Sequence, residues 1–247
     1  MIKKVVIAAA GQGTRMLNLS KDKPKHLISV NGRPFLSYLF DSLFLAGYKD
    51  IILVTGYMQE AMDNFKKDYT APNKGKIKIE IVNQSDCPNL KGKYGTACPL
   101  MCLNNKVKDQ FLYIYGDNLF SVEDLKAMNV DDEFCYVAGV KQERPEKYGV
   151  LVENSDGLLE KIVEKPKEFV GNLVNAGLYK FTSKVFEKIP MIEKSLRGEY
   201  EITDAVSLLA KDRKVKIKEL KDCWYDFGSP EDIEKVSKFL NENNKGK

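Results

Sequence analysis

The sequence predicts an α/β fold, with a Rossmann-like, mostly parallel sheet flanked by helices and an added, partly antiparallel region. In the first half, short apolar runs alternate with amphipathic helical patterns. In the second half, strand patterns follow one another closely. Alternating strands and helices are typical of a parallel sheet covered on both faces. The chain has 247 residues, of which 43% are hydrophobic, enough for the core of one such domain.

The elements of the first half follow from local patterns. Residues 3–10 are an apolar run too short to span a membrane, and they predict a buried strand. Residues 34–47 place apolar side chains on one broad face and end at a glycine, which predicts a helix. Similar patterns predict strands at 51–55, 77–82 and 111–115 and helices at 58–68 and 96–104. Ligands of such sheets bind at the carboxyl ends of strands, here the loops after residues 10, 55, 82 and 115.

The second half supplies the added region. Strands are expected at 134–140, 149–153, 159–164, 173–181 and 215–220, and helices near 183–189, 201–211 and 230–240. No linker or repeat divides the chain. We therefore expect a single domain over residues 1–247, with two halves of about 1–130 and 131–247.

Charge and composition exclude some functions. The net charge is +4, and the lysines are spread along the chain among acids. A nucleic-acid-binding module would concentrate its basic residues in a stripe with interleaved aromatics, so this class is disfavoured. A modest positive balance suits small phosphorylated ligands. No segment is apolar and long enough to cross a membrane.

Cysteine and histidine usage narrows the chemistry further. The five cysteines are odd in number and form no CxxC pair, which argues against a disulfide framework and favours a reducing cytoplasm. Cys98 and Cys102 are expected to be small core residues. His26 is the single histidine, so a multi-histidine zinc site is excluded and histidine-based nucleophilic catalysis is disfavoured.

The strongest local signal is the segment Gly11-Gln12-Gly13-Thr14-Arg15, directly after the first strand. Glycines let the backbone approach a phosphate closely, and the N–H groups then point at it. Met16 stands where a dinucleotide fingerprint would need its third glycine, and no Gly-Lys-Ser/Thr follows. Both NAD binding and a kinase-type phosphate loop are therefore disfavoured.

With Pro24-Lys25 following, the segment Gly11 to Lys25 resembles the opening motif of sugar-phosphate nucleotidyltransferases, although Asn18 stands where many members have proline. Further stretches resemble motifs of the same family, in the same order and over nearly the whole chain. These are Gly116-Asp117-Asn118, Glu164-Lys165-Pro166, Asn175-Ala176-Gly177, the segment Arg197 to Asp204, and Trp224 to Ser229, where Ser229 replaces the usual threonine.

The resemblance implies an Mg²⁺-dependent enzyme that joins a nucleoside triphosphate to a sugar 1-phosphate and releases pyrophosphate. The first half would bind the nucleotide and the second, partly antiparallel half the sugar phosphate. It implies that Arg15 and Lys25 are catalytic and that Asp117 and Asp226 bind the metal. The implied nucleotide-binding residues are Ala10, Gly11, Gly13, Thr14, Gln84, Gly95 and Thr96. The implied sugar-phosphate-binding residues are Gly149, Glu164, Lys165, Asn175 and Arg197.

Base choice depends on Gln84, whose amide offers a donor and an acceptor that match uracil or thymine. We therefore expect UTP or dTTP, with glucose 1-phosphate as the sugar substrate. A cytidylyl- or guanylyltransferase stays open as an alternative, as does a catalytically silent regulatory domain that binds a nucleotide sugar. A homo-oligomer also stays open. The sequence carries no left-handed β-helix repeats, so no fused acyltransferase domain is expected.

Overall fold

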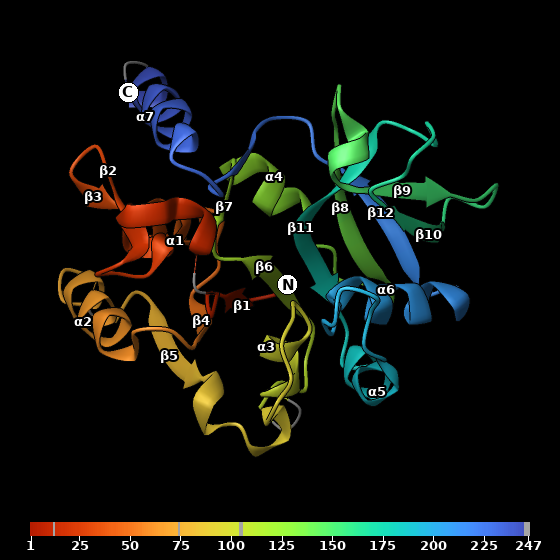
Figure 1. Ribbon diagram of the computed structural model, residues 1–247, viewed down its shortest axis with the longest axis horizontal. Helices are drawn as coiled ribbons and strands as arrows, with labels where there is room; N and C mark the ends of the chain where they lie inside the picture. The colour runs from red at the N-terminus through yellow and green to blue at the C-terminus, as the bar shows by residue number, and fades with distance from the viewer. Residues whose placement is uncertain (12, 74, 104–105, 245–247) are drawn as a thin grey trace.

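A computed structural model describes residues 1–247 except 12, 74, 104–105 and 245–247 (Figure 1). Gln12 of the glycine-rich segment thus lies outside the described residues. Within the described part, nine strands form one sheet in the order β10-β9-β11-β6-β1-β4-β5, with β8 pairing to β11 and β12 pairing to β8. The predicted fold class is confirmed.

The parallel half consists of β1 (Lys4–Ala8), β4 (Asp50–Thr55), β5 (Lys78–Asn83) and β6 (Phe111–Tyr115). Strand β1 pairs in parallel with β4 on one side and with β6 on the other. The chain therefore runs outward from β1 to β4 and β5, then returns to the opposite side of β1. Such a reversal opens a crevice at the carboxyl ends of the two central strands.

The second half extends the same sheet. Strand β11 (Leu173–Phe181) pairs antiparallel with β6, so the added region continues from the parallel core. It is completed by β8 (Cys135–Lys141), β9 (Gly149–Glu153), β10 (Leu159–Glu164) and β12 (Val215–Glu219). Strand β12 runs parallel to β8, whereas β8 and β9 run antiparallel to β11. The expected mixture of directions is confirmed.

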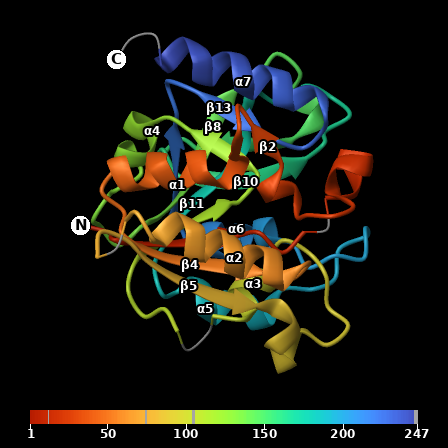
Figure 2. The same ribbon diagram turned by 90° about the vertical axis from the view of Figure 1, so that its left-hand side faces the viewer.

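Helices cover both faces of the sheet (Figures 1 and 2). One face packs against α1 (Phe35–Leu45), α2 (Gln59–Thr70) and α4 (Val122–Ala127). Helix α7 (Glu231–Asn244) adds Val236 to the same core cluster and contacts residues 29–30 and 224–226, which lie outside the large sheet. The opposite face of the sheet packs against α3 (Cys98–Met101), α5 (Val185–Lys188) and α6 (Ile202–Lys211). In β1, Val5 and Ile7 belong to the first core and Val6 to the second. Burial on both faces explains why β1 is a continuous apolar run.

Two predicted helices are shorter than expected. The pattern at 96–104 forms only α3, and Asn104 lies outside the described residues. Gly95, with φ of +134°, precedes the helix, and after the helix the N–H of Leu103 donates to Leu100 O at 2.9 Å, which is the spacing of a tight turn and not of an α-helix. The pattern at 183–189 forms α5 and then tightens into the 3₁₀ turn η6 (Ile189–Met191), which contains Pro190. Proline lacks the N–H that an α-helix would need there.

Several short elements escape prediction, because all but one have only two or three residues and so show no periodicity, and the exception, η1, is kinked at Leu17. They comprise β2 (Ser29–Val30), β3 (Arg33–Pro34), β7 (Asn118–Phe120), β13 (Trp224–Asp226), and the 3₁₀ turns η1 (Thr14–Ser20), η2 (Lys25–Leu27), η3 (Gln84–Asp86), η4 (Pro88–Leu90) and η5 (Pro145–Lys147). Helix α4 also escaped prediction.

The cysteines behave as expected. All five have free thiols, Cys98 is buried, and Cys102 packs against the same core cluster. Among the described helices, none has the length and apolar character needed to cross a membrane.

Candidate active site

A cavity of about 400 Å³ lies at the carboxyl ends of β1, β5 and β6 and is lined by residues of both halves of the chain. Three of the four loops expected at this edge contribute to it. The loop after residue 55 does not line the cavity. Its Gly56 packs beneath the first loop instead, where a Cβ would lie 3.1 Å from the carbonyl oxygen of Ala10. The loop after residue 55 therefore packs against the loop that contains Ala10 and does not face the cavity.

Most of the sequence-predicted site residues come together here. Those that line the cavity are Ala10, Gly11, Arg15, Lys25, Gln84, Gly95, Thr96, Asp117, Gly149, Glu164, Asn175, Arg197 and Asp226. Gly13, Thr14 and Lys165 are not among the lining residues.

Gly13 has a packing function that the sequence did not reveal. Its φ is +67°, and a Cβ there would lie 2.9 Å from Cβ of Lys25. The loop is also anchored by Ser20, whose hydroxyl donates to Gly13 O at 2.9 Å. A glycine at this position therefore lets Lys25 approach the loop. Thr14, which also does not line the cavity, is the first residue of the 3₁₀ turn η1.

The Glu164-Lys165 turn places only its first residue in the cavity. Glu164 faces Arg197 at 3.8 Å, and Arg197 also donates to Glu201 at 2.8 Å. Lys165 is exposed, with φ of +44°, and its N–H donates to the carbonyl of Tyr148 at 2.9 Å. The backbone of Lys165 thus shapes the turn, while its side chain lies outside the cavity lining.

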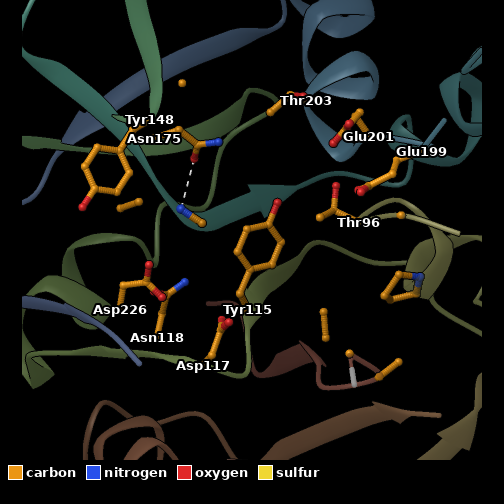
Figure 3. A pocket seen from close by; sticks show the side chains of 18 of the residues that line it. Thr96, Tyr115, Asp117, Asn118, Tyr148, Asn175, Glu199, Glu201, Thr203 and Asp226 are labelled. Carbon is orange, nitrogen blue, oxygen red and sulfur yellow. Dashed lines mark hydrogen bonds between the residues drawn. The ribbon is translucent and has the colours of Figure 1, made fainter. Parts of the chain in front are cut away.

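Asp117 and Asp226 converge, although they lie far apart in the chain. Asp117 follows β6, and Asp226 ends β13. The antiparallel ladder between β7 and β13 sets Asp226 opposite Asn118. The N–H of Phe227 donates to the carbonyl of Asp117 at 2.8 Å. Figure 3 shows Asp117, Asn118 and Asp226 gathered on one side of the cavity.

Asp117 forms an ion pair with Lys25, whereas no ion pair of Asp226 is found among the described residues. Burial alone would raise the pKa of Asp117, but the charge and hydrogen bond of Lys25, together with His26 and a backbone hydrogen bond, outweigh burial and lower that pKa. Burial, followed by the charge of Asp117, raises the pKa of Asp226 to about 6. Burial and the neighbouring Lys25 lower the pKa of His26 to about 3, so this imidazole is neutral at physiological pH. Asp226 therefore lacks full compensation by a cation.

The carboxylate pair fits a hard divalent cation. Mg²⁺ prefers carboxylate and phosphate oxygens and is usually bound by one or two carboxylates together with substrate phosphates. Within the described part of the chain, no group of three or more His, Cys, Asp or Glu side chains is placed to enclose a metal. Two carboxylates alone leave coordination positions of the ion open, and oxygens of a bound phosphate could fill them. The raised pKa of Asp226 indicates that this carboxylate has room for a further positive charge beside it.

The cavity also contains residues that the sequence did not single out for a role. They include His26, Tyr115, Asn118, Tyr148, Glu199, Glu201, Thr203 and Trp224. Tyr115 was detectable, because it is the last residue of the strand before Gly116-Asp117. The ring of Tyr148 packs edge-on against Trp224 with centroids 5.5 Å apart, and this pairing had no sequence signal.

A crevice at the switch point of an α/β sheet, with a basic glycine-containing loop and a carboxylate pair, is typical of proteins that bind nucleoside phosphates. The family model described as "Nucleotidyl transferase" matches residues 4–243. The chain therefore belongs to the nucleotidyl transferase family.

Individual relatives agree with this assignment. The bifunctional sugar-1-phosphate nucleotidylyltransferase/acetyltransferase of Sulfurisphaera tokodaii is 36% identical over 241 residues, covering 97% of this chain and 56% of that protein. The chain thus spans little more than half of that relative. The UTP–glucose-1-phosphate uridylyltransferase AglF of Haloferax volcanii is 31% identical over 246 residues, covering 97% of each chain.

Solved structures share the fold. A Bacillus anthracis structure named for glucose-1-phosphate thymidylyltransferase, in complex with sucrose, is 27% identical with a TM-score of 0.78, covering 96% of this chain and 94% of that one. A UDP-glucose pyrophosphorylase complexed with UDP-glucose is 24% identical with a TM-score of 0.83, covering 98% and 100% of the two chains.

Proposed function

We propose that this protein transfers a nucleotidyl group from UTP or dTTP to a sugar 1-phosphate, with glucose 1-phosphate as the sugar substrate. A phosphate oxygen of the sugar 1-phosphate attacks the α-phosphorus of the nucleotide. The bond from that phosphorus to the bridging oxygen breaks, and pyrophosphate leaves. The attacking phosphate is already ionised, so no general base is required. The name of AglF supports UTP and glucose 1-phosphate, and the name of the Sulfurisphaera tokodaii relative supports a sugar 1-phosphate.

One observation carries the proposal: two cations and two carboxylates from distant parts of the chain line a single cavity. They are Arg15, Lys25, Asp117 and Asp226. Phosphoryl-type transfers depend mainly on positioning and on neutralising charge, which this set of groups is suited to provide. In our proposal Arg15 holds the departing phosphates, and Lys25 stabilises the charge that develops at the α-phosphate.

The cofactor in this proposal is Mg²⁺, held by Asp117 and Asp226. When bound, the ion would neutralise charge on the phosphate oxygens of the nucleotide. The ion pair between Lys25 and Asp117 keeps that carboxylate ionised. Asp226 would be deprotonated at the pH of the cell, because its pKa is about 6.

Binding of the two substrates would divide along the halves of the single domain. On the nucleotide side, the loop residues Ala10, Gly11, Gly13 and Thr14 would form or shape the phosphate site. Gln84, Gly95 and Thr96 would contact the base. On the sugar side, Gly149, Glu164, Asn175 and Arg197 would orient the pyranose. Lys165 would reach the sugar phosphate only if its exposed side chain turned toward the cavity.

The direct test is a grid of nucleoside triphosphates against sugar 1-phosphates, with pyrophosphate release as the readout. UTP or dTTP with glucose 1-phosphate should give the highest kcat/KM. Gln84→Ala should reduce the preference for these nucleotides over CTP by roughly 5- to 150-fold, because an unpaired buried polar group costs about 1–3 kcal/mol. Ser85→Ala, at the adjacent exposed residue, is the matched control. Preference for CTP or GTP would contradict the base assignment, and no pyrophosphate with any pair would indicate a regulatory domain.

A further inference from the structure

The segment that leads into α3, on the nucleotide side, crosses the segment that leads into α6, on the sugar side. The N–H of Tyr200 donates to Tyr94 O at 2.8 Å, and the N–H of Ala97 donates back to Tyr200 O at 2.9 Å. Gly95 lies between these two bonds with φ of +134°, and a Cβ there would lie 2.3 Å from Tyr200 O. The two segments are therefore in direct backbone contact.

A third bond at this crossing comes from a side chain. The hydroxyl oxygen of Thr96 accepts the N–H of Ile202 at 2.9 Å, although 106 positions separate the two residues in the chain. The backbone of Thr96 is held as well, because its carbonyl accepts the hydroxyl of Tyr113 at 2.8 Å. Tyr113 is fully buried in β6, so Thr96 is anchored to the centre of the sheet.

Helix α6 requires an acceptor for its first N–H. Ile202 is the first residue of α6 and is fully buried, so its N–H has no access to water. Glu201, the residue before it, makes no side-chain cap hydrogen bond. Most helices begin after a serine, threonine, aspartate or asparagine that caps the first turn from within the same segment. In this protein Thr96 supplies an acceptor from a distant segment.

The start of α6 carries groups of the sugar side. Glu201 and Thr203 line the cavity, and Glu201 is itself buried. Arg197 donates to Glu201 at 2.8 Å, and the hydroxyl of Ser195 donates to the same carboxylate at 3.1 Å. Figure 3 shows Thr96 and Glu201 on the same side of the cavity. A displacement of the first turn of α6 would therefore move the carboxylate that holds Arg197.

We propose that Thr96 is a positioning residue for the sugar 1-phosphate: its hydroxyl oxygen fixes the first turn of α6, and thereby Glu201 and Thr203. The inference rests on the proposed function, because it concerns the sugar-binding side of the same cavity. It gives a residue of the nucleotide side an effect on the other substrate. In this assignment a contact of Thr96 with the base uses its backbone N–H and not its hydroxyl.

Replacements of similar shape test the role of the hydroxyl. Thr96→Val removes the acceptor, whereas Thr96→Ser keeps it. KM is measured for glucose 1-phosphate at saturating UTP, and for UTP at saturating glucose 1-phosphate. Thr96→Val should raise KM for glucose 1-phosphate roughly 5- to 100-fold, the range expected when a buried N–H loses its partner, and leave KM for UTP unchanged. Thr96→Ser should keep both values close to those of wild type.

Thr70→Val is the matched control. It makes the same change at a hydroxyl of α2 that donates to Lys66 O at 2.8 Å, and Thr70 is not among the residues that line the cavity. Both KM values should stay unchanged in this variant. If Thr96→Val does not fold, Thr96→Ala removes the same acceptor without adding a methyl group and gives the same comparison.

A second measurement follows the hydrogen bond itself and needs no turnover. Hydrogen exchange of the Ile202 amide, read by NMR, should be roughly 5- to 100-fold faster in Thr96→Val than in wild type, because the amide has lost its acceptor. It should stay at the wild-type rate in Thr96→Ser and Thr70→Val. Unchanged exchange in Thr96→Val would show that this bond does not hold the start of α6, and it would overturn the inference.

The kinetic outcomes separate this inference from the proposed function. A rise in KM for UTP alone would show that the hydroxyl reads the nucleotide, which overturns the inference and leaves the proposed function standing. Equal rises in both KM values, a fall in kcat alone, or values equal to those of Thr70→Val would have the same meaning for the inference. No pyrophosphate from wild type with any pair of substrates would overturn both.

Discussion

The N–H of Phe227 donates to the carbonyl oxygen of Asp117 at 2.8 Å, and this bond ties the segment after β6 to the segment after β13. Asp226, the residue before Phe227, is thereby held beside Asp117. After burial, the charge of Asp117 is the largest cause of the raised pKa of Asp226. The ladder between β7 and β13 has only three residues on each strand. It is enough to hold Asp226 beside Asp117, because all three residues of each strand pair with the other strand.

Asp117→Asn and Asp226→Asn should each lower kcat by roughly 10²- to 10⁴-fold at saturating Mg²⁺, because each removes a charged oxygen ligand from the proposed metal site. Circular dichroism should show an unchanged fold. Asp156→Asn is the control, since Asp156 is an exposed carboxylate paired with Arg213 far from the cavity. Full activity in both active-site variants would contradict the proposed metal site.

Asp226→Asn should also make the metal-free protein more stable above pH 6. The carboxyl has a pKa of about 6 in the folded protein, compared with 3.8 for the free group. The folded state therefore holds its proton more tightly, and wild type loses stability as the pH rises from about 4 to 6. Above pH 6 the variant should be more stable by about 1–3 kcal/mol, since one pKa unit corresponds to about 1.4 kcal/mol.

Thermal melting of both proteins at pH 4 and pH 7.5, without and with Mg²⁺, checks this expectation. The advantage of Asp226→Asn should be absent at pH 4. It should shrink with Mg²⁺ at pH 7.5, because the ion stabilises the folded wild type by binding it. A variant less stable than wild type at pH 7.5 without Mg²⁺ would show that Asp226 is compensated by its neighbours.

Arg15→Ala and Lys25→Ala should each reduce kcat by roughly 10²- to 10³-fold, because each removes a charge expected to act most strongly in the transition state. Lys23→Ala is the control from the same segment, since Lys23 is exposed and absent from the cavity lining. Steady-state kinetics should show the loss in kcat rather than only in KM. Turnover at the control's level in both variants would remove these residues from the mechanism.

Gly13→Ala tests whether the glycine positions Lys25. The added Cβ would lie 2.9 Å from Cβ of Lys25, in a backbone conformation with φ of +67°. Turnover should fall at least about 10-fold, since small displacements of a catalytic group reduce rates strongly. Gly32→Ala is the matched control, because its φ is +79° but no atom lies within 4 Å of the added Cβ. Gly32→Ala should lose about 1 kcal/mol of stability from backbone strain, and Gly13→Ala should lose somewhat more, because its Cβ also displaces Lys25. Equal turnover in the two variants would mean that Gly13 serves only the turn.

Much of the fold was predictable from local patterns. The apolar run of β1, the amphipathic pattern of α1 and the strands from 134 to 181 all form close to their expected bounds. Failures occurred where tertiary contacts outweighed local preference. Around Gly95, the segment before α3 pairs with Tyr200 through Tyr94 O and Ala97 N–H and is not helical. Residues 118–120 and 224–226 become strands only because each pairs with the other.

The sequence by itself determined the family resemblance, the order of strands and helices and most residues of the candidate site, because these depend on residue types and spacings within short segments. Only the tertiary structure decided which of those residues share one cavity, that Gly13 makes room for Lys25, and that Lys165 is not among the residues that line the cavity. It also brought the hydroxyl of Thr96 to the first residue of α6. The physical reason is that these relationships arise from strand pairing and packing between residues far apart in the chain, which no local pattern encodes.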